Sequence, residues 1–132
     1  MAEKKVTEQT EEKVEKVARD SAMAISKGVG VTPRKVRLVI DLVRGKSVYE
    51  AYNILNNLNK AAKTPVLKTI KSAVANATHN FGMNEAALYI DTIYANDGPR
   101  LKRYLPRAKG SASGLVKRWS HITVIVKEKG AK

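Results

Sequence analysis

The sequence predicts an α+β fold in which three helices pack on a small antiparallel sheet and a long two-stranded β-hairpin arm extends from the body. Three observations support this. Apolar residues recur at helical spacing between residues 33 and 80, the period changes to two after residue 87, and a strongly basic segment separates that strand from a second one. With 132 residues and 43% apolar content, the chain can bury one core.

The chain begins with a polar segment and a short strand. Residues 1–20 hold six acids and five bases, which predicts a flexible N-terminal extension, and residues 21–130 are expected to form a single α+β domain. Residues 22–31 (AMAISKGVGV) alternate in part and predict the first strand, loosened at its end by Gly28 and Gly30.

The first helix has clear boundaries. Thr32 is a suitable cap, Pro33 fits the first helical position, and Gly45 is placed to end the helix. Its apolar face is Val36, Val39, Ile40 and Val43, supported by Leu42. Its basic residues are left for the outside: Arg34, Lys35, Arg37 and Arg44.

Two further helices follow. The second begins with a capping box, Ser47 to Glu50, and its buried face is Ala51, Ile54, Leu55 and Leu58. The third starts or makes its first turn at Thr64 and Pro65, runs to about Asn80 and ends at Gly82. Its core stripe is Leu67, Ile70, Val74 and Ala77, with Ala73 and Ala75 permitting close packing.

Two strands complete the fold. Leu88, Ile90, Thr92 and Tyr94 alternate with Tyr89, Asp91, Ile93 and Ala95, and residues 119–126 (WSHITVIV) are β-branched and aromatic. We expect a hairpin over about 88–126, paired through residues 102–104 and 115–117, with its turn near residues 106–114. Each side would hold ~18–20 residues and span roughly 60 Å, beyond a body of roughly 30–35 Å.

The outer half of this ribbon is expected to order on a partner, because two strands alone are marginally stable in water. Pro99 and Pro106 limit its pairing, since proline donates no ladder bond. Trp119 is interpreted as an anchor at the arm's base rather than as a base-stacking platform.

Charge indicates the partner. The net charge is +13, and residues 21–132 alone hold twenty bases and six acids. No acid occurs between residues 98 and 127. Residues 99–118 carry seven bases, whose natural complement is a nucleic acid: Arg100, Lys102, Arg103, Arg107, Lys109, Lys117 and Arg118.

Other classes of function lack the residues they need. The absence of cysteine argues against disulfides, thiolate metal sites and thiol catalysis. Neither His79 nor His121 has another histidine or an acid at the spacing of a metal ligand. The acids are too scattered for a paired-carboxylate site, so we expect no enzyme and no cofactor. No stretch has the length of a membrane span or the layout of a signal peptide, so an intracellular protein is expected.

Two alternatives stay open. An architectural DNA-binding protein could insert the arm, with Pro106 as a wedge, into a groove of the duplex; preference for duplex DNA over structured RNA would favour it. An RNA-acting enzyme is disfavoured by the missing catalytic constellation, and turnover of a nucleic-acid substrate would be needed to support it.

Three collinear stretches carry a family resemblance. They are TPRKVRLVIDLVRGKSVYEA, KSAVANATHNFG and DGPRLKRYLPRAKGSASGLVKRWSHITVIV. Over about residues 22–127 the chain closely resembles bacterial ribosomal protein L-twenty-two, in which PRAKG followed by KRxSHITV is the most specific part.

The resemblance implies a non-enzymatic structural constituent of the large ribosomal subunit, cytoplasmic and without a cofactor. The body would lie on the subunit's outer surface beside the exit of the nascent-peptide tunnel, and the hairpin tip would form part of the tunnel wall. Implied partners are large-subunit rRNA, whose assembly it would aid, neighbouring ribosomal proteins and the passing nascent polypeptide. No membrane and no homo-oligomer are expected.

The resemblance also assigns residues. Expected rRNA contacts of the body are Arg34, Lys35, Arg37, Arg44 and Lys46. Lys63, Lys68 and Lys71 are added to them for their place on or near the polar side of the third helix, and not from the resemblance. Expected rRNA contacts of the arm are Arg100, Lys102, Arg103, Arg107, Lys109, Lys117, Arg118 and His121. The expected tunnel-facing tip is Leu105, Pro106, Arg107, Ala108, Lys109, Gly110, Ser111, Ala112 and Ser113.

The chain departs from the family pattern twice. Residues 1–20 lie outside it, and Ser111 stands where members often have arginine, which removes one positive charge from the tip.

Overall fold

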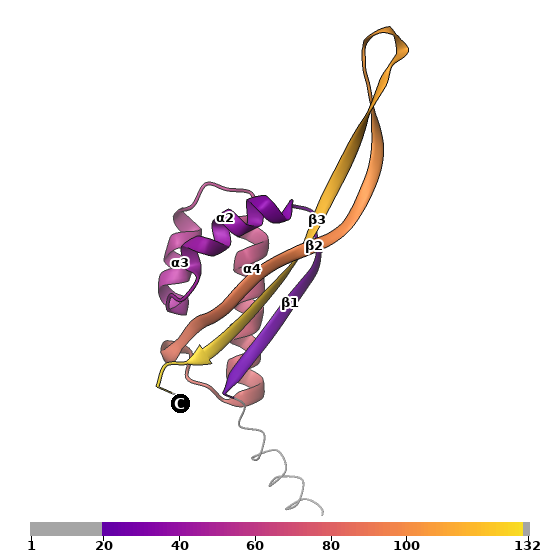
Figure 1. Ribbon diagram of the computed structural model, residues 1–132. Helices are drawn as coiled ribbons and strands as arrows, with labels where there is room; N and C mark the ends of the chain where they lie inside the picture. The colour runs from indigo at the N-terminus through magenta and orange to yellow at the C-terminus, as the bar shows by residue number, and fades with distance from the viewer. Residues whose placement is uncertain (1–19, 131–132) are drawn as a thin grey trace, which may run out of the picture.

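The computed structural model describes residues 20–130, so the predicted N-terminal extension lies almost entirely outside the described residues. Within them the chain forms three helices and three strands, which confirms the predicted α+β fold with its hairpin arm (Figure 1). In chain order these are β1 (Ser21–Val29), α2 (Pro33–Val43), α3 (Val48–Asn57), α4 (Lys63–Ala75), β2 (Leu88–Pro106) and β3 (Ala112–Glu128). A π-helical turn, Asn76–Asn80, continues α4.

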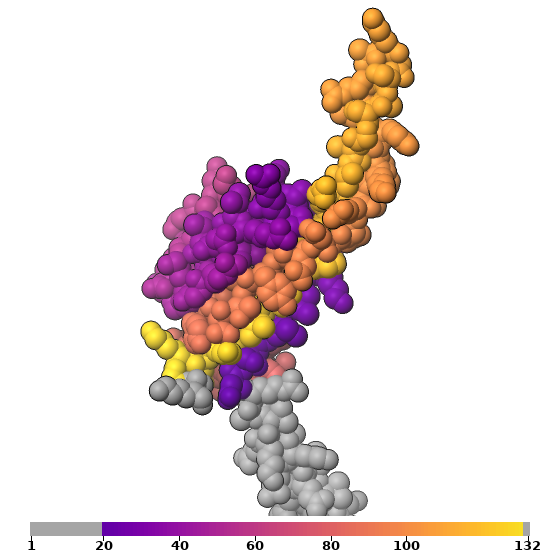
Figure 2. All heavy atoms as spheres, viewed as in Figure 1, coloured from indigo at the N-terminus to yellow at the C-terminus, as the bar shows by residue number. Residues whose placement is uncertain are grey.

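The sheet is antiparallel, with strand order β1-β3-β2, so the C-terminal strand is central. The helices pack on one face of the sheet, and the other face is uncovered (Figures 1 and 2). Met23 and Ile25 of β1 and Tyr94 of β2 lie on the uncovered face and are 52%, 49% and 40% exposed. The sheet therefore has a buried layer toward the helices and an apolar, solvent-facing layer on the other side.

Both ends of α2 are where the sequence placed them. Thr32 occupies the cap position and Pro33 the first turn, but the Thr32 side chain makes no capping hydrogen bond, so the expected role of its hydroxyl was wrong. Backbone geometry alone starts the helix, since proline's fixed φ is already helical. Gly45 has a φ of 75° just past the end, a conformation that glycine adopts without steric cost.

The α3 capping box is confirmed. The Glu50 backbone N–H donates to Ser47 Oγ at 3.3 Å, and the Ser47 N–H donates to the Glu50 carboxylate at 3.4 Å. Two backbone donors that the helix cannot satisfy internally thereby gain partners.

Replacing Ser47 by alanine should lower the free energy of unfolding by about 1 kcal/mol, the usual cost of losing a helix cap. Urea denaturation followed by circular dichroism measures it. Ser72→Ala is the control, because Ser72 is an exposed residue inside α4. Equal changes in the two variants would mean that the box adds nothing to stability.

The buried stripe of α4 differs from the expected one at its first member, and one of the two alanines expected to permit close packing is not buried. Ile70, Val74 and Ala77 are buried as predicted, but Val66 is fully buried where Leu67 is only half-buried, and Ala75 is exposed. The helix lies against β1 and β3, and its buried Ala73 and Ala77 meet a strand that presents Ala22 and Ala24. Small residues on both sides place the helix close to the sheet, and this contact sets the rotation of α4.

The alternation predicted for β2 holds only for its first residues. Leu88 and Ile90 are buried, but the next buried residues are Ile93 and Ala95, because the register against β3 shifts between Ile90 and Thr92. One extra residue in one strand is a β-bulge, and it moves every later side chain to the opposite face. The prediction that Thr92 and Tyr94 share the face of Ile90 was therefore wrong.

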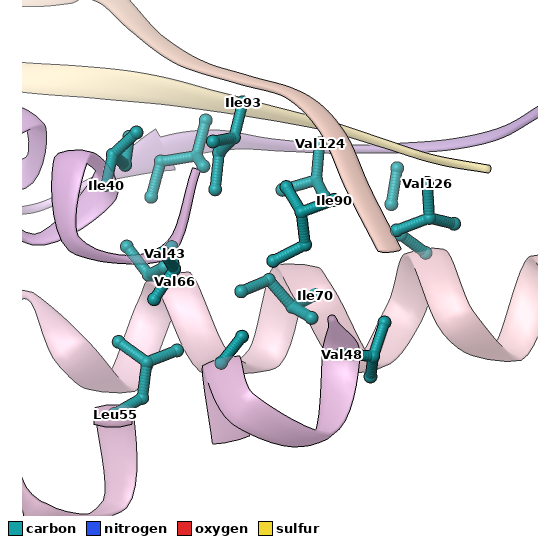
Figure 3. Packing of buried hydrophobic residues seen from close by; sticks show 14 of the residues in the cluster. Ile40, Val43, Val48, Leu55, Val66, Ile70, Ile90, Ile93, Val124 and Val126 are labelled. Atoms are coloured by element: carbon teal, nitrogen blue, oxygen red, sulfur yellow. The ribbon is translucent and has the colours of Figure 1, made fainter. Parts of the chain in front are cut away.

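The core lies between the helices and the inner face of the sheet (Figure 3). Ile40 of α2, Leu55 of α3 and Ile70 of α4 are fully buried and belong to the same cluster as Ile90 and Val124 of the sheet. Ile70 lies next to Ile90, and Leu55 lies farther from the sheet, on the side of Val66. Each such side chain contributes about 1.5–3 kcal/mol on burial, so this one layer accounts for the cohesion of the body.

The lengths of the two long strands match the prediction, but the projecting arm is shorter than expected. The inner halves of β2 and β3 belong to the body's sheet, and residues 100–106 and 112–118 alone extend beyond it, about 23 Å at about 3.3 Å per residue (Figures 1 and 2). The predicted pairing of residues 102–104 with 115–117 is off by one residue, because Lys102 lies opposite Val116, Arg103 opposite Leu115 and Tyr104 opposite Gly114. The ladder continues to Pro106 opposite Ala112. The turn is therefore residues 107–111. That the outer half orders on a partner stays a prediction.

Candidate nucleic-acid interface

The arm has two chemically distinct faces, set by the alternation of its ladder. We call one the Tyr104 face; it carries Arg100, Lys102, Tyr104, Gly114, Val116 and Arg118. We call the other the Arg103 face; it carries Leu101, Arg103, Leu105, Ser113, Leu115 and Lys117. All seven basic side chains that the sequence singled out in this segment are exposed. Both faces therefore present cations to a partner.

These cations lie close to one another and have little internal compensation. Arg100 stands directly opposite Arg118, and Arg103 is the diagonal neighbour of Lys117. Like charges opposite each other destabilise a strand pair. Among the described residues, the single acid paired with an arm base is Asp97, 3.6 Å from Arg100 Nη2 and itself exposed. Dense phosphate is the complement that removes this repulsion.

The tip is a closed turn tied by its own hydrogen bonds. The Arg107 N–H donates to the Ser111 carbonyl at 2.7 Å, and Ser111 Oγ donates to the Ala108 carbonyl at 2.8 Å. Arg107 Nε also donates to Ser113 Oγ at 3.1 Å. Lys109 is held at a φ of 59°, the left-handed region that non-glycine residues rarely occupy. The serine that departs from the family pattern thus helps to close the turn.

Two predicted RNA-binding arginines of α2 also hold the fold together. Arg37 donates from Nε and Nη2 to the Ala95 carbonyl at 3.2 and 3.0 Å, and Arg44 donates from Nη2 to the Ile93 carbonyl at 3.2 Å. Both carbonyls lie on the outer edge of β2, which has no strand beside it. This second role could not be predicted from the sequence, because the sequence does not reveal which strand is at the edge.

Arginine retains further donors after such bonds, so the two guanidinium groups stay suited to phosphate. The hydrogen bonds to β2 hold both guanidinium groups in place. Asp41, 2.8 Å from Arg44 Nη1, offsets part of the charge of Arg44.

The other predicted basic residues of the body are divided between two regions. Arg34, Lys35 and Lys46 are exposed on or just after α2, whose first residues lie beside the base of the arm (Figure 1). On α4, Lys68 and Lys71 are exposed and Lys63 is half-buried. The exposed bases at the beginning of α2 thus lie next to the base of the basic arm, and we call the two together the basic surface.

His121 has a structural partner. Its Nδ1 accepts a hydrogen bond from the Gly28 N–H at 3.0 Å, across the irregular end of the β1–β3 pairing. An accepting Nδ1 leaves the imidazole proton on Nε2, so the outward nitrogen is a donor. Its predicted RNA contact is compatible with this geometry and stays a prediction.

Acidic side chains gather at the end of the body away from the arm. Glu50 and Glu128 line an open depression there, together with Ser47, Tyr89 and Lys129. Burial, and then the charge of nearby Glu85, raise the pKa of Tyr52 above its ordinary value.

On the uncovered face of the sheet, Lys127 Nζ lies 2.9 Å from Asp91. This hydrogen bond lowers the pKa of Asp91 and raises that of Lys127. In residues 20–130, Asp41, Asp91 and Asp97 are thus ion-paired, and Glu50 and Glu128 lie at the end of the body away from the arm.

Neither a metal centre nor a membrane span is found in the part of the chain that the structure describes. Its histidines and acids form no group of three placed to hold a metal ion. No helix in residues 20–130 is both long and apolar enough to cross a bilayer.

Known proteins share this sequence over most of its length. Residues 24–127 match the family model for Ribosomal protein L22p/L17e. The chain belongs to this family. It is a family of ribosomal proteins and not of enzymes, as the absence of a catalytic constellation in the sequence had indicated.

Individual relatives agree with the family match. A protein of Clostridium novyi named Large ribosomal subunit protein uL22 is 56% identical over 108 residues, which cover 82% of this chain and 97% of the relative. Proteins with the same name from Acetivibrio thermocellus and Latilactobacillus sakei are 50% and 55% identical, over 86% and 84% of this chain and 90% and 95% of their own lengths. The region matched by the family model includes the whole arm.

Proposed function

We propose that this L22p/L17e family member is a structural constituent of the large ribosomal subunit in the cytoplasm, where it binds the subunit's rRNA and aids its assembly. The carrying observation is the arm, where Arg100 faces Arg118 and Arg103 lies diagonal to Lys117. Among the described residues, Asp97 beside Arg100 is the single acid paired with any of these cations. The relatives' name supports the choice of the large subunit.

The proposed mechanism is electrostatic and geometric. The α2 part of the basic surface docks on RNA, and the arm enters between RNA segments, where its two faces neutralise phosphates on both sides. Double-stranded RNA is recognised mainly through backbone, shape and 2′-hydroxyl contacts, which exposed arginine and lysine side chains can make. The ion pairs and acids at the opposite end keep that end off the RNA, and neighbouring ribosomal proteins are the partners proposed for it.

The tip is proposed to line the tunnel through which the nascent polypeptide leaves. Its shape supports this: residues 107–111 form a narrow, hydrogen-bonded turn whose small members, Ala108, Gly110 and Ser111, occupy little space. A wall beside a moving polypeptide needs a surface that is compact and closed by internal bonds, as this turn is.

The test is sedimentation of a cell lysate through a sucrose gradient at low magnesium, with immunoblotting for the protein after high-salt washes. Recovery in the large-subunit peak, stoichiometric with its rRNA and resistant to salt, is expected. Recovery at the top of the gradient, or with material that DNase releases, would contradict the proposal and favour the architectural DNA-binding alternative.

A further inference from the structure

Tyr104 is the most exposed large apolar or aromatic side chain of the described residues. It is 82% exposed, on the outer part of β2, where it packs against no core. Tyr49 on α3 is 75% exposed, but it lies on the body, away from the arm. The candidate contacts drawn from the sequence passed over Tyr104 because they were chosen for charge.

The ladder leaves the ring of Tyr104 uncovered from the opposite strand. Its cross-strand partner is Gly114, which has no side chain, and a Cβ added there would meet no atom within 4 Å. The diagonal neighbours on this face are Ala112 and Val116, of which alanine is too small to cover an aromatic ring. One face of the strand pair is thus open around the ring.

The same face is cationic. Lys102 precedes Tyr104 by two residues, and the Arg100–Arg118 pair follows farther down the stem. Within residues 20–130, Arg100 alone of these cations is ion-paired, with Asp97. An exposed aromatic ring beside exposed cations is the arrangement by which proteins bind single-stranded nucleic acid, since the cations track phosphates while a base stacks on the ring. An apolar peptide would gain nothing from the three cations.

We propose that Tyr104 stacks on an unpaired nucleobase of the RNA that receives the arm. This inference rests on the proposed function and adds a contact of a different kind, because stacking depends on the flat ring and not on charge. It divides the arm into a stem that binds phosphates and a single aromatic residue that binds a base.

Binding of the full chain to large-subunit rRNA transcribed in vitro tests the proposal. Tyr104→Phe keeps the ring and should bind within twofold of the wild type, whereas Tyr104→Leu should bind on the order of tenfold more weakly. The salt dependence should be the same for all three, since no charge changes. Tyr49→Leu is the matched control and should bind like the wild type.

A second variant leaves Tyr104 in place. Gly114→Val puts a β-branched side chain opposite the ring, a pairing that favours the strand ladder while covering the ring, so affinity should fall without loss of thermal stability. Wild-type affinity in both Tyr104→Leu and Gly114→Val would overturn the stacking proposal and leave the proposed function intact. Absence of rRNA binding by the wild type would overturn both.

A photoreactive phenylalanine derivative at position 104, in assembled subunits, identifies the occupant. Crosslinking to a nucleotide of the rRNA is expected. Crosslinking to the nascent polypeptide alone would overturn the proposal and assign Tyr104 to the tunnel side.

Discussion

Reversing charge on the Arg103 face should uncouple folding from RNA binding. In the free protein, Arg103→Glu places a carboxylate diagonal to Lys117, so a repulsive pair becomes an attractive one and the arm should be as stable as before or more so. Against rRNA, the same change should remove a charge-assisted contact worth about 1.5–3 kcal/mol, a loss of about tenfold or more in affinity. Lys117→Glu should have the same two effects, an arm at least as stable as before and weaker binding to rRNA.

Assembly gives the cellular measure of this effect. Cells whose sole copy carries Arg103→Glu or Lys117→Glu should accumulate large-subunit precursors on sucrose gradients. Lys13→Glu and Lys16→Glu, in the N-terminal segment, are the controls because they change the net charge by the same amount. They distinguish the effect of a lower overall positive charge from the effect of losing a contact of the arm. Equal, mild effects in all four variants would contradict the arm model.

The salt dependence adds a quantitative check. Each lost phosphate contact should lower the slope of log affinity against log salt concentration by about one. The double variant of Arg103 and Lys117 should therefore lower it by about two, and an unchanged slope would mean that these side chains touch no phosphate.

Local signals in the sequence were enough to predict the elements. Periodicity located the three helices, the Ser47–Glu50 spacing located the start of α3, and the pairing of residues 102–104 with 115–117 followed, to within one residue, from folding one basic segment in half. Each of these depends on residues close in sequence or related by a simple hairpin. Long-range geometry was what the sequence did not contain.

The errors have the same origin. The bulge near Asp91 depends on how β2 fits β3 and the helices, and no residue type marks it. The second role of Arg37 and Arg44 depends on β2 being an edge strand. Tyr104 became visible as a candidate when its cross-strand partner was known to be Gly114. Charge alone predicted a surface for RNA, and the ladder was needed to propose how that surface would bind it.

Gly98→Ala should damage the junction between body and arm. Gly98 lies in the second irregularity of the β2–β3 pairing, between Asp97 and Arg100, and a Cβ there would come within 2.9 Å of the Trp119 backbone carbonyl carbon and 3.1 Å of the Ser120 nitrogen. Backbone atoms of the central strand cannot rotate away as a side chain can. We therefore expect the overpacking cost of about 1–3 kcal/mol, or about 4 °C of melting temperature for each kcal/mol.

The control for Gly98→Ala lies on the arm itself. Gly114 has room for a Cβ, so Gly114→Ala should leave the melting temperature within about 2 °C of the wild type, since a surface change of this kind stays within about 0.5 kcal/mol.

Equal melting temperatures for the two variants would show that the junction accommodates the added Cβ without loss of stability. A lower value for Gly98→Ala, with weaker rRNA binding at a temperature where the body is folded, would show that the close contact with β3 fixes the direction in which the arm leaves the body. A rigid direction matters for the proposed function, in which the arm enters RNA beside the docked body, because an error of angle at the junction grows along the arm to its tip.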